Sequence, residues 1–213
     1  DMVVAVHDAG WPVAIHAIGD QGVSWVLDAF ENSPRGEGMA MDRIEHIEVA
    51  TPSDVKRFGA LGIAASMQPH HATCCVGDYV IDRIGMQRLE NAYVWRQMLD
   101  NGNHLVLGSD WATSPLNPLV QISDTLHRET RLDGIVQSWD QGNTLTFDEA
   151  LHGYTQAAAD MTPWADEIGS ISIGKWADFV ILDEHITDNV GRSIENRTVE
   201  ATYLAGLRVY PAE

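Results

Sequence analysis

The sequence contains very little lysine and cysteine. Only two of its 13 basic residues are lysines, Lys56 and Lys175. The sequence has 31 acidic residues, which gives a formal net charge of −18. A surface of that sign repels phosphate backbones, so we expect no binding to nucleic acid. The two cysteines, Cys74 and Cys75, are adjacent and provide no disulfide framework. This favours a reducing compartment, and we expect the protein to be cytoplasmic.

Long hydrophobic runs and nucleotide-binding motifs are also missing. No apolar run approaches the ~18 residues that a membrane span requires, so no membrane insertion is expected. A Gly-x-Gly-x-x-Gly or P-loop pattern is absent, which argues against an open α/β nucleotide-binding protein. The 213 residues, 45% of them apolar, suffice for one sizeable core or for one domain with part of another. Because the chain opens on Asp1 without a signal peptide, we interpret it as a processed or cloned fragment.

The excess of acidic residues fits an ordinary acidic enzyme and also a halophile, a salt-adapted organism. In concentrated salt the repulsion between like charges is screened, because the Debye length is ~3 Å at about 1 M. We therefore expect weaker folding in low salt. A melting temperature that stays constant between about 0.1 M and 2 M KCl would contradict this expectation.

The first two thirds of the chain alternate between strand and helix patterns. Short apolar segments with β-branched residues predict four strands, at residues 11–17, 43–47, 63–68 and 104–108. Helical patterns follow them, at residues 21–31, 51–62, 92–101 and 119–128. The stretch 69–89 is expected to be a long loop. Repeated βα units of this kind predict an α/β fold in which a parallel sheet is covered by helices.

The pattern changes after Asp140. Thr146 and Glu149 form a capping box that opens a helix running to Ala159. Alternating segments then predict antiparallel β-structure, at residues 169–175, 177–182, 199–204 and 207–210. We therefore predict two domains, residues 1–160 and residues 161–213.

Three polar residues lie at the carboxyl ends of predicted strands. His16 comes near the end of the first strand, His46 closes the second, and Asp110 follows the fourth. In α/β sheets and barrels, ligand groups cluster at this edge. A single strand-end histidine is usually structural, but two imidazoles and a carboxylate at one edge form a ligand set for a divalent metal such as Zn²⁺.

Side-chain alternation makes a further prediction for the second strand. If His46 points to the site, Ile44 shares its face, and Arg43 and Glu45 point toward the helix layer, where they can pair with each other. Asp20 is expected to cap the N-terminus of the helix that begins at Gln21.

Five motifs, in this order, resemble the amidohydrolase superfamily. They are His-Ala-Ile-Gly-Asp at 16–20, Arg-Ile-Glu-His at 43–46, Met-Gln-Pro-His-His at 67–71, Gly-Ser-Asp-Trp at 108–111 and Gly-Lys-Trp-Ala-Asp-Phe-Val-Ile-Leu at 174–182. Within this superfamily the sequence most resembles amidohydrolase family 3, the branch that includes the N-substituted formamide deformylases and proteins labelled exoenzyme regulators. The similarity extends over nearly the whole chain.

The resemblance implies a metal-dependent (β/α)₈ TIM barrel with a small β-sandwich. It implies that the predicted strands are barrel strands five to eight, so that the chain is the C-terminal half. His16 and His46 then correspond to metal-binding histidines, and Asp110 to the catalytic, metal-contacting aspartate. The His-x-His pair of the family does not occur here. We therefore expect a missing N-terminal half, or a second copy, to cover the open barrel.

The function implied by the resemblance is hydrolysis of a carbon–nitrogen bond in a small non-peptide amide, with Zn²⁺ as the expected cofactor. Asp110 would move the proton, His71 would reach the substrate or its oxyanion, and Trp111 would wall the pocket. We expect the fragment alone to be inactive. The alternative is a non-catalytic or regulatory homologue that keeps the fold. A second metal site at His70, His71, Cys74 and Cys75 is the alternative to a simple rim loop there.

Overall fold

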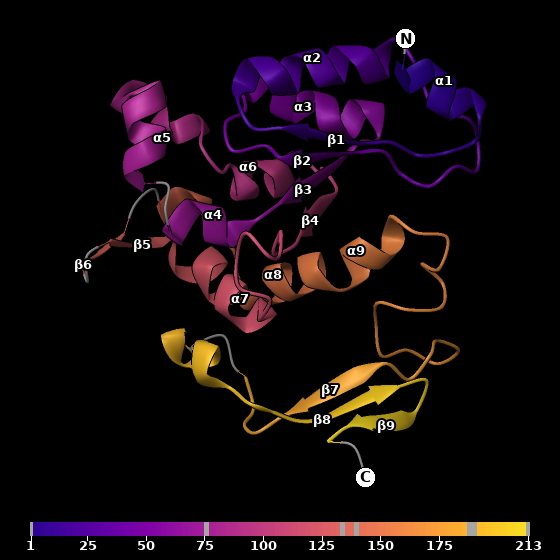
Figure 1. Cartoon of the computed structure of the whole chain (residues 1–213), viewed down its shortest axis with the longest axis vertical. Coiled ribbons are helices and arrows are strands. Elements are labelled where there is room, and N and C mark those ends of the chain that lie inside the picture. The colour runs from indigo at the N-terminus through magenta and orange to yellow at the C-terminus, as the bar shows by residue number, and fades with distance from the viewer. Residues whose placement is uncertain (1, 75–76, 133–134, 139–140, 187–190, 212–213) are drawn as a thin grey trace.

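The computed structural model of the protein describes residues 2–74, 77–132, 135–138, 141–186 and 191–211. It is an α/β structure with a parallel sheet and helices at one end and a separate antiparallel sheet at the other (Figure 1). No helix among the described residues is long and apolar enough to cross a membrane.

The parallel sheet has four short strands in sequential order. They are β1 (Ala14–Ala17), β2 (Arg43–His46), β3 (Ala64–Met67) and β4 (Leu105–Leu107). All neighbouring pairs are parallel. The prediction of a parallel sheet is therefore confirmed, and the carboxyl ends of all four strands meet at one edge.

The four predicted helices are present in the predicted order, and a further helix precedes β1. They are α1 (Met2–Asp8), α2 (Asp20–Glu31), α3 (Pro52–Leu61), α6 (Trp95–Asp100) and α7 (Pro118–His127). The helix signals of α3 are confirmed in detail: the Thr51 side chain accepts a hydrogen bond from the Asp54 amide at 3.1 Å, and Gly62 ends the helix with φ 65°. Asp20 is not the predicted cap, because Gly19 holds that position and Asp20 begins α2 and pairs with Arg88.

The predicted loop at residues 69–89 is helical instead. It forms α4 (Pro69–Cys74), α5 (Gly77–Ile84) and the 3₁₀ helix η1 (Met86–Asn91). Ala72 and Val80 are buried in the core and anchor the segment. Cys75 lies outside the described residues, as does the side chain of Cys74.

The alternation predicted for β2 is wrong. Ile44 is fully buried in the core with residues of α2 and α3, so Arg43 and Glu45 face the opposite side. Their predicted mutual ion pair is present at 2.5 Å. The physical reason is that His46 has φ 82°, which interrupts the pleat and turns its side chain out of the alternating pattern.

A buried arginine links several elements beneath the sheet edge. Arg128, fully buried, places its guanidinium 4.7 Å from the centre of the Trp95 ring and donates hydrogen bonds to the backbone oxygens of Ala92 and Tyr93, both at 2.5 Å. The side chain of His7, on α1, is only 5% exposed, and its Nε2 atom lies 3.2 Å from Asp42 Oδ1. Asp42 lies 35 residues further along the chain, so this contact joins segments that are distant in the sequence.

The region after α7 departs from the prediction in two places. A hairpin, β5 (Glu129–Leu132) with β6 (Ile135–Ser138), and the turn η2 (Gln141–Asn143) were not foreseen. The capping box at Thr146 is confirmed, but the helix breaks at Thr155 into α8 (Phe147–Tyr154) and α9 (Gln156–Asp160).

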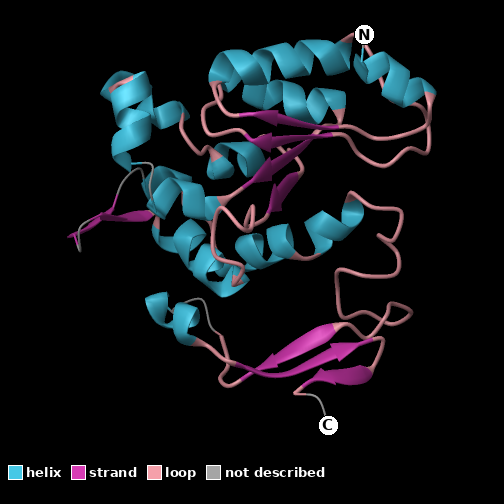
Figure 2. Cartoon of the chain, in the orientation of Figure 1, coloured by secondary structure: helices cyan, strands magenta, loops and turns pink. Residues whose placement is uncertain are grey.

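The antiparallel sheet contains β7 (Phe179–Leu182), β8 (Val199–Leu204) and β9 (Leu207–Tyr210), and η3 (Gly191–Asn196) precedes β8 (Figure 2). The predicted strand at 169–175 is a series of turns. The Lys175 ammonium holds these turns by donating to the backbone oxygens of Ala165 and Ile168, each at 2.7 Å. The domain boundary between residues 160 and 161 stays a prediction.

Candidate metal centre

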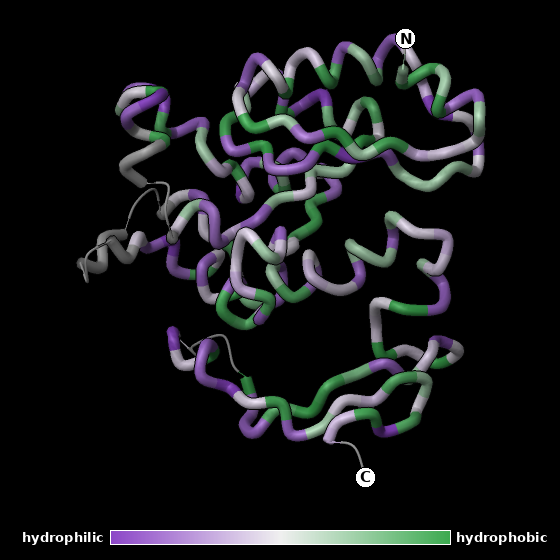
Figure 3. The backbone as a smooth tube through the Cα atoms, in the orientation of Figure 1, coloured by the Kyte–Doolittle hydropathy of each residue, from purple (hydrophilic) through white to green (hydrophobic). Residues whose placement is uncertain are grey.

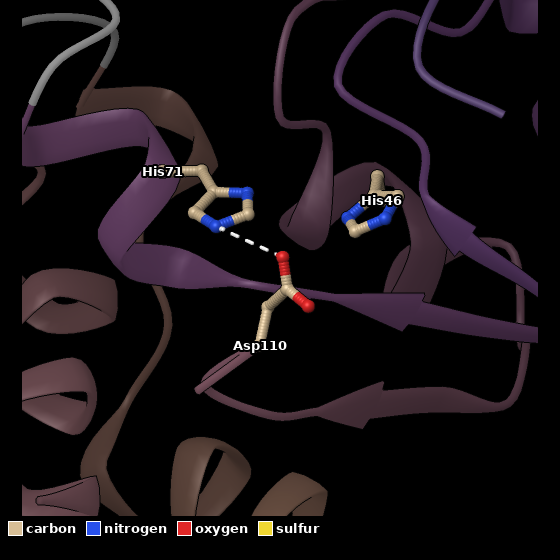
Figure 4. A group of neighbouring side chains, drawn as sticks. All are labelled: His46, His71 and Asp110. Carbon is tan, nitrogen blue, oxygen red and sulfur yellow. Dashed lines mark ion pairs between the residues drawn. The ribbon is translucent and has the colours of Figure 1, made fainter. Parts of the chain in front are cut away.

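His46, His71 and Asp110 lie together at the carboxyl edge of the parallel sheet (Figure 4). Each residue offers one ligand atom, and the three atoms all lie within 4.8 Å of one another. The residues come from three elements: His46 ends β2, His71 lies on α4 directly after β3, and Asp110 follows β4. The parallel sheet therefore positions the cluster.

The backbone is unusual at two of these residues. His46 has φ 82° and Asp110 has φ 54°, both in the left-handed region that few residues other than glycine adopt. Such conformations tend to occur where the surrounding structure holds functional side chains in place. At His46 and Asp110 they turn the side chains toward the cluster.

His71 provides the observation that tests whether a metal fits. Its Nε2 atom lies 3.7 Å from an Asp110 carboxylate oxygen, and its Nδ1 atom lies 3.6 Å from Glu48 Oε1. Nε2 is buried and has no hydrogen-bond partner among the described residues. An unsatisfied buried nitrogen is costly unless another group completes its coordination. Two imidazoles and one carboxylate suit a divalent cation, so the residues present fit such an ion.

His46 is held on both sides of its ring. Its Nδ1 atom lies 2.9 Å from Gln68 Oε1. The His16 ring packs edge-on against it with centroids 4.5 Å apart, and the His71 ring stacks on it with centroids 5.8 Å apart. The three imidazoles thus form one row along the sheet edge.

His16 is the outermost of the predicted site residues. It is exposed, and its register partner on β2 is Glu45. The His16 ring contacts His46. Among the described residues, however, the three that could hold an ion are His46, His71 and Asp110, without His16. The assignment of His16 as a metal ligand stays a prediction.

Trp111 is next to Asp110 in the chain, and 66% of it is exposed. Its backbone amide donates a hydrogen bond to the Ser109 hydroxyl at 3.1 Å. An exposed indole beside the cluster is available for contact with a ligand, and the predicted role of Trp111 in substrate binding stays a prediction.

His70 points to a different partner. Its Nδ1 atom lies 2.8 Å from a carboxylate oxygen of buried Asp124, so this pair joins α4 to α7. Burial raises the pKa of the neighbouring Tyr154 well above its usual value, and the charge of Asp124 adds to this effect. His70 is therefore paired with Asp124, and the cysteine side chains of the second-site alternative lie outside the described part.

Two buried residues near the cluster were missed from the sequence, Glu48 and Gln68. Glu48 comes two residues after His46, and Gln68 begins the Gln-Pro-His-His motif at 68–71. Their positions next to motif histidines were the available signal. Their contacts, however, depend on how the histidine rings are turned, which spacing does not reveal.

The family model described as "Amidohydrolase family" matches residues 1–210. The chain therefore belongs to the amidohydrolase family, and the resemblance stated from its motifs is confirmed.

Curated relatives agree with this membership. The chain is 34% identical to Protein LONG AFTER FAR-RED 3 of Arabidopsis thaliana over 99% of its own length and 36% of that protein. It is 30% identical to the putative amidohydrolase YtcJ of Bacillus subtilis, over 85% of this chain and 34% of that protein. It is 28% identical to the N-substituted formamide deformylase of Arthrobacter pascens, over 99% of this chain and 38% of that protein. The chain thus spans about a third of the length of these relatives.

Solved structures also match. An uncharacterized metal-dependent hydrolase from Pyrococcus furiosus aligns with a TM-score of 0.66 at 30% identity, over 81% of this chain and 34% of that one. A second, from Pyrococcus horikoshii, aligns with a TM-score of 0.71 at 27% identity, over 85% and 36%. The fold of the chain is thus shared with part of each of these proteins.

Proposed function

We propose that the intact protein is a metal-dependent hydrolase that cleaves a carbon–nitrogen bond in a small non-peptide amide. The observation that carries this proposal is the convergence of His46, His71 and Asp110 around a buried, unsatisfied imidazole nitrogen. The family membership and the formamide deformylase among the relatives support the substrate class. Zinc is the proposed metal, because imidazole and carboxylate ligands suit it.

We assign His46 and Asp110 as metal ligands. The third ligand is either His16, which the sequence predicts, or His71, which lies closer to Asp110 in the structure. When bound, the divalent cation would polarise a substrate carbonyl and make a water molecule more acidic. The Zn²⁺ affinities of His16→Ala and His71→Ala distinguish these two assignments, because only the variant that removes a ligand should lose affinity.

Asp110 is suited to proton transfer. Its side chain is 40% exposed, so both water and substrate can reach the carboxylate, while His71 lies 3.7 Å away on the buried side. A positioned general acid–base of this kind contributes ~10²–10⁴-fold to a rate. His71 would also hold the substrate oxygen if it is not a metal ligand, and Trp111 would cover the substrate from the solvent side.

We further propose that β1–β4 are strands five to eight of a barrel, and that β7–β9 belong to a small β-sandwich. Among the described residues, no strand pairs with the outer edge of β1 or of β4. Exposed strand edges are usually paired or covered, so further strands or a second copy would complete the barrel. The molar mass of the intact protein, measured by light scattering, distinguishes one copy from two.

Metal analysis and hydrolysis assays on the intact protein test the function, using a panel of N-substituted amides. Asp110→Asn should reduce turnover by ~10²–10⁴-fold, whereas Asp8→Asn, at an exposed position at the end of α1, serves as the matched control and should not. Unchanged turnover in Asp110→Asn would contradict the role of Asp110. A folded protein without metal or turnover would favour the alternative, a regulatory homologue.

Cytoplasmic location and adaptation to salt stay predictions. The net charge of −18 supports adaptation to salt, because salt screens the repulsion between the acidic residues and so stabilises the fold. The KCl dependence of the melting temperature is its test.

A further inference from the structure

Gln68 joins two strands of the sheet through its side chain. It follows β3 directly, and only 4% of it is exposed. Its Oε1 atom lies 2.9 Å from His46 Nδ1, and its Nε2 amide donates to the Ser66 backbone oxygen at 3.5 Å. Only the nitrogen of an amide can donate, so the contact with Ser66 is a hydrogen bond only when the other end of the Gln68 amide faces His46. That end is the oxygen.

An amide oxygen accepts hydrogen bonds and cannot donate them. His46 must therefore carry its hydrogen on Nδ1, and in the neutral ring Nε2 then keeps an unshared electron pair. We propose that Gln68 is a positioning residue that fixes the tautomer and the ring orientation of His46, so that Nε2 is the atom presented to a cation. This inference rests on the proposed metal-dependent function, and Gln68 itself touches neither metal nor substrate.

The backbone of β2 explains why such a residue is needed. With φ 82°, His46 has left the pleat, so the regular alternation of the strand no longer fixes the direction of its side chain. Among the described residues, the ring is held by the Gln68 hydrogen bond and by ring contacts with His16 and His71. Ring contacts do not distinguish the two nitrogens, whereas the hydrogen bond from Nδ1 does.

His71 has the same arrangement of its two ring nitrogens as His46, but at longer distances. Its Nδ1 atom faces a carboxylate oxygen of Glu48 at 3.6 Å, and its Nε2 atom faces Asp110 at 3.7 Å. Each histidine of the cluster thus has an oxygen on its Nδ1 side. Metal-binding histidines generally donate their second ring N–H to an oxygen of this kind. The contact of Gln68 is the shorter one, and it carries the proposal.

The first test is made on the metal-free intact protein. Long-range ¹H–¹⁵N NMR spectra, recorded above the pH range in which histidine is protonated, report which ring nitrogen of His46 bears the hydrogen. We expect the Nδ1–H tautomer in the wild type. Gln68→Met, which keeps length but removes the acceptor, should lose this preference, and Gln68→Glu, which keeps an acceptor oxygen, should retain it.

The second test measures the affinity for Co²⁺ by its visible absorption and the affinity for Zn²⁺ by competition. Gln68→Met should bind either ion ~10–100-fold more weakly, the usual cost of losing such a partner, and Gln68→Glu should remain close to the wild type. The matched control is Gln97→Met, because Gln97 lies on α6 and donates to the Glu90 backbone oxygen, away from the cluster.

The two proposals fail in different ways. An Nε2–H tautomer for His46 in the wild type would overturn the inference about Gln68 whether or not metal binds, and this measurement needs no variant to fold. Equal metal affinity in Gln68→Met and the wild type would overturn it too. The expected tautomer in a protein that binds no metal would support the role of Gln68 and would count against the proposed function alone.

Discussion

The parallel sheet of β1–β4 and the antiparallel sheet of β7–β9 both contain apolar strands, but these strands differ strongly in burial. β7 consists of hydrophobic residues (Figure 3), as does β4 of the parallel sheet. Yet β3 and β4 are buried throughout, whereas every residue of β9 is exposed. Leu107 on β4 is 4% exposed and Leu207 on β9 is 72% exposed. An apolar strand therefore contributes to stability only where other residues cover it.

This difference explains where the candidate site lies. A site needs side chains held on rigid elements, and the parallel sheet supplies them because helices pack against it. The antiparallel sheet leaves large apolar side chains in water, including Val180 and Val209. Exposed apolar patches of this kind mark contact surfaces. The parallel sheet thus anchors the site, and the antiparallel sheet is suited to pack against further structure.

The largest expected effect comes from truncating a buried side chain of the parallel sheet. Leu107→Ala removes a leucine packed in the main core between β4 and α8. We expect a loss of about 2–5 kcal/mol in the free energy of unfolding, since transfer and cavity costs add. Urea unfolding at neutral pH measures it. A loss below about 1 kcal/mol would show that this sheet is as loosely covered as β9.

An ion pair between two helices of the same half should have the next largest effect. The Arg96 guanidinium, on α6, donates to Glu149, on α8, and holds the pKa of that carboxyl at about 2, against a usual 4.5. Because the folded pKa is the lower one, the pair stabilises the protein above about pH 4–5, and this contribution is lost as the pH falls toward 2.

Glu149→Gln should remove this contribution. Both side chains are partly exposed, which weakens the pair through solvent screening, so we expect about 1–2 kcal/mol at neutral pH. Unfolding free energies at about pH 7 and pH 3 measure it, and the variant should depend less on pH than the wild type. If the unfolding free energies of the variant and the wild type change equally with pH, other carboxylates cause the acid sensitivity.

Gly153 tests the packing of α8 on β4 from the other side. A Cβ atom built at Gly153 would lie 2.9 Å from Cγ and Cδ1 of Leu107, so Gly153→Ala overpacks the contact. Overpacking costs about 1–3 kcal/mol, and the better helix propensity of alanine returns about 0.5–1 kcal/mol. We expect a net loss of about 1 kcal/mol in thermal or urea unfolding.

Two controls sharpen this test. Gly22→Ala, on α2, meets only the Ala17 Cβ atom at 3.8 Å and should be neutral or stabilising. In the double variant Leu107→Ala/Gly153→Ala, the cavity left by Leu107 accepts the new methyl group. The loss in unfolding free energy should therefore be smaller than the sum of the losses in the two single variants. Strict additivity would mean that the two residues do not touch.

The features predicted from the sequence are those that local chemistry determines. The caps at Thr51 and Thr146 and the four strands depend on neighbouring residues, and the structure shows them. The edge at which His46 and Asp110 meet followed from topology alone. The place of His71 beside them did not, because residues 69–89 were expected to be a loop and the burial of Ala72 and Val80 makes them helical.

Other features depend on partners far away in the chain. The side chain of His7 packs against Asp42, 35 residues later, with His7 Nε2 3.2 Å from Asp42 Oδ1. The contact of Gln68 with His46 follows from a backbone angle of 82°, which no spacing of residues reveals. The misassigned faces of β2 have the same cause. The α/β arrangement with a parallel sheet could thus be predicted from pattern, whereas the side-chain partners of the site required coordinates.

The smallest effect should come from the counterpart of Leu107 on the exposed sheet. Leu207→Ala removes the same atoms, but 72% of Leu207 is already in water, so little apolar area is lost and no cavity forms. We expect a change within about 0.5 kcal/mol in urea unfolding of this chain. A loss approaching that of Leu107→Ala would instead mean that β9 is covered in solution. Melting temperatures that rise with protein concentration would then identify a second copy as the cover, since association stabilises the folded state by mass action.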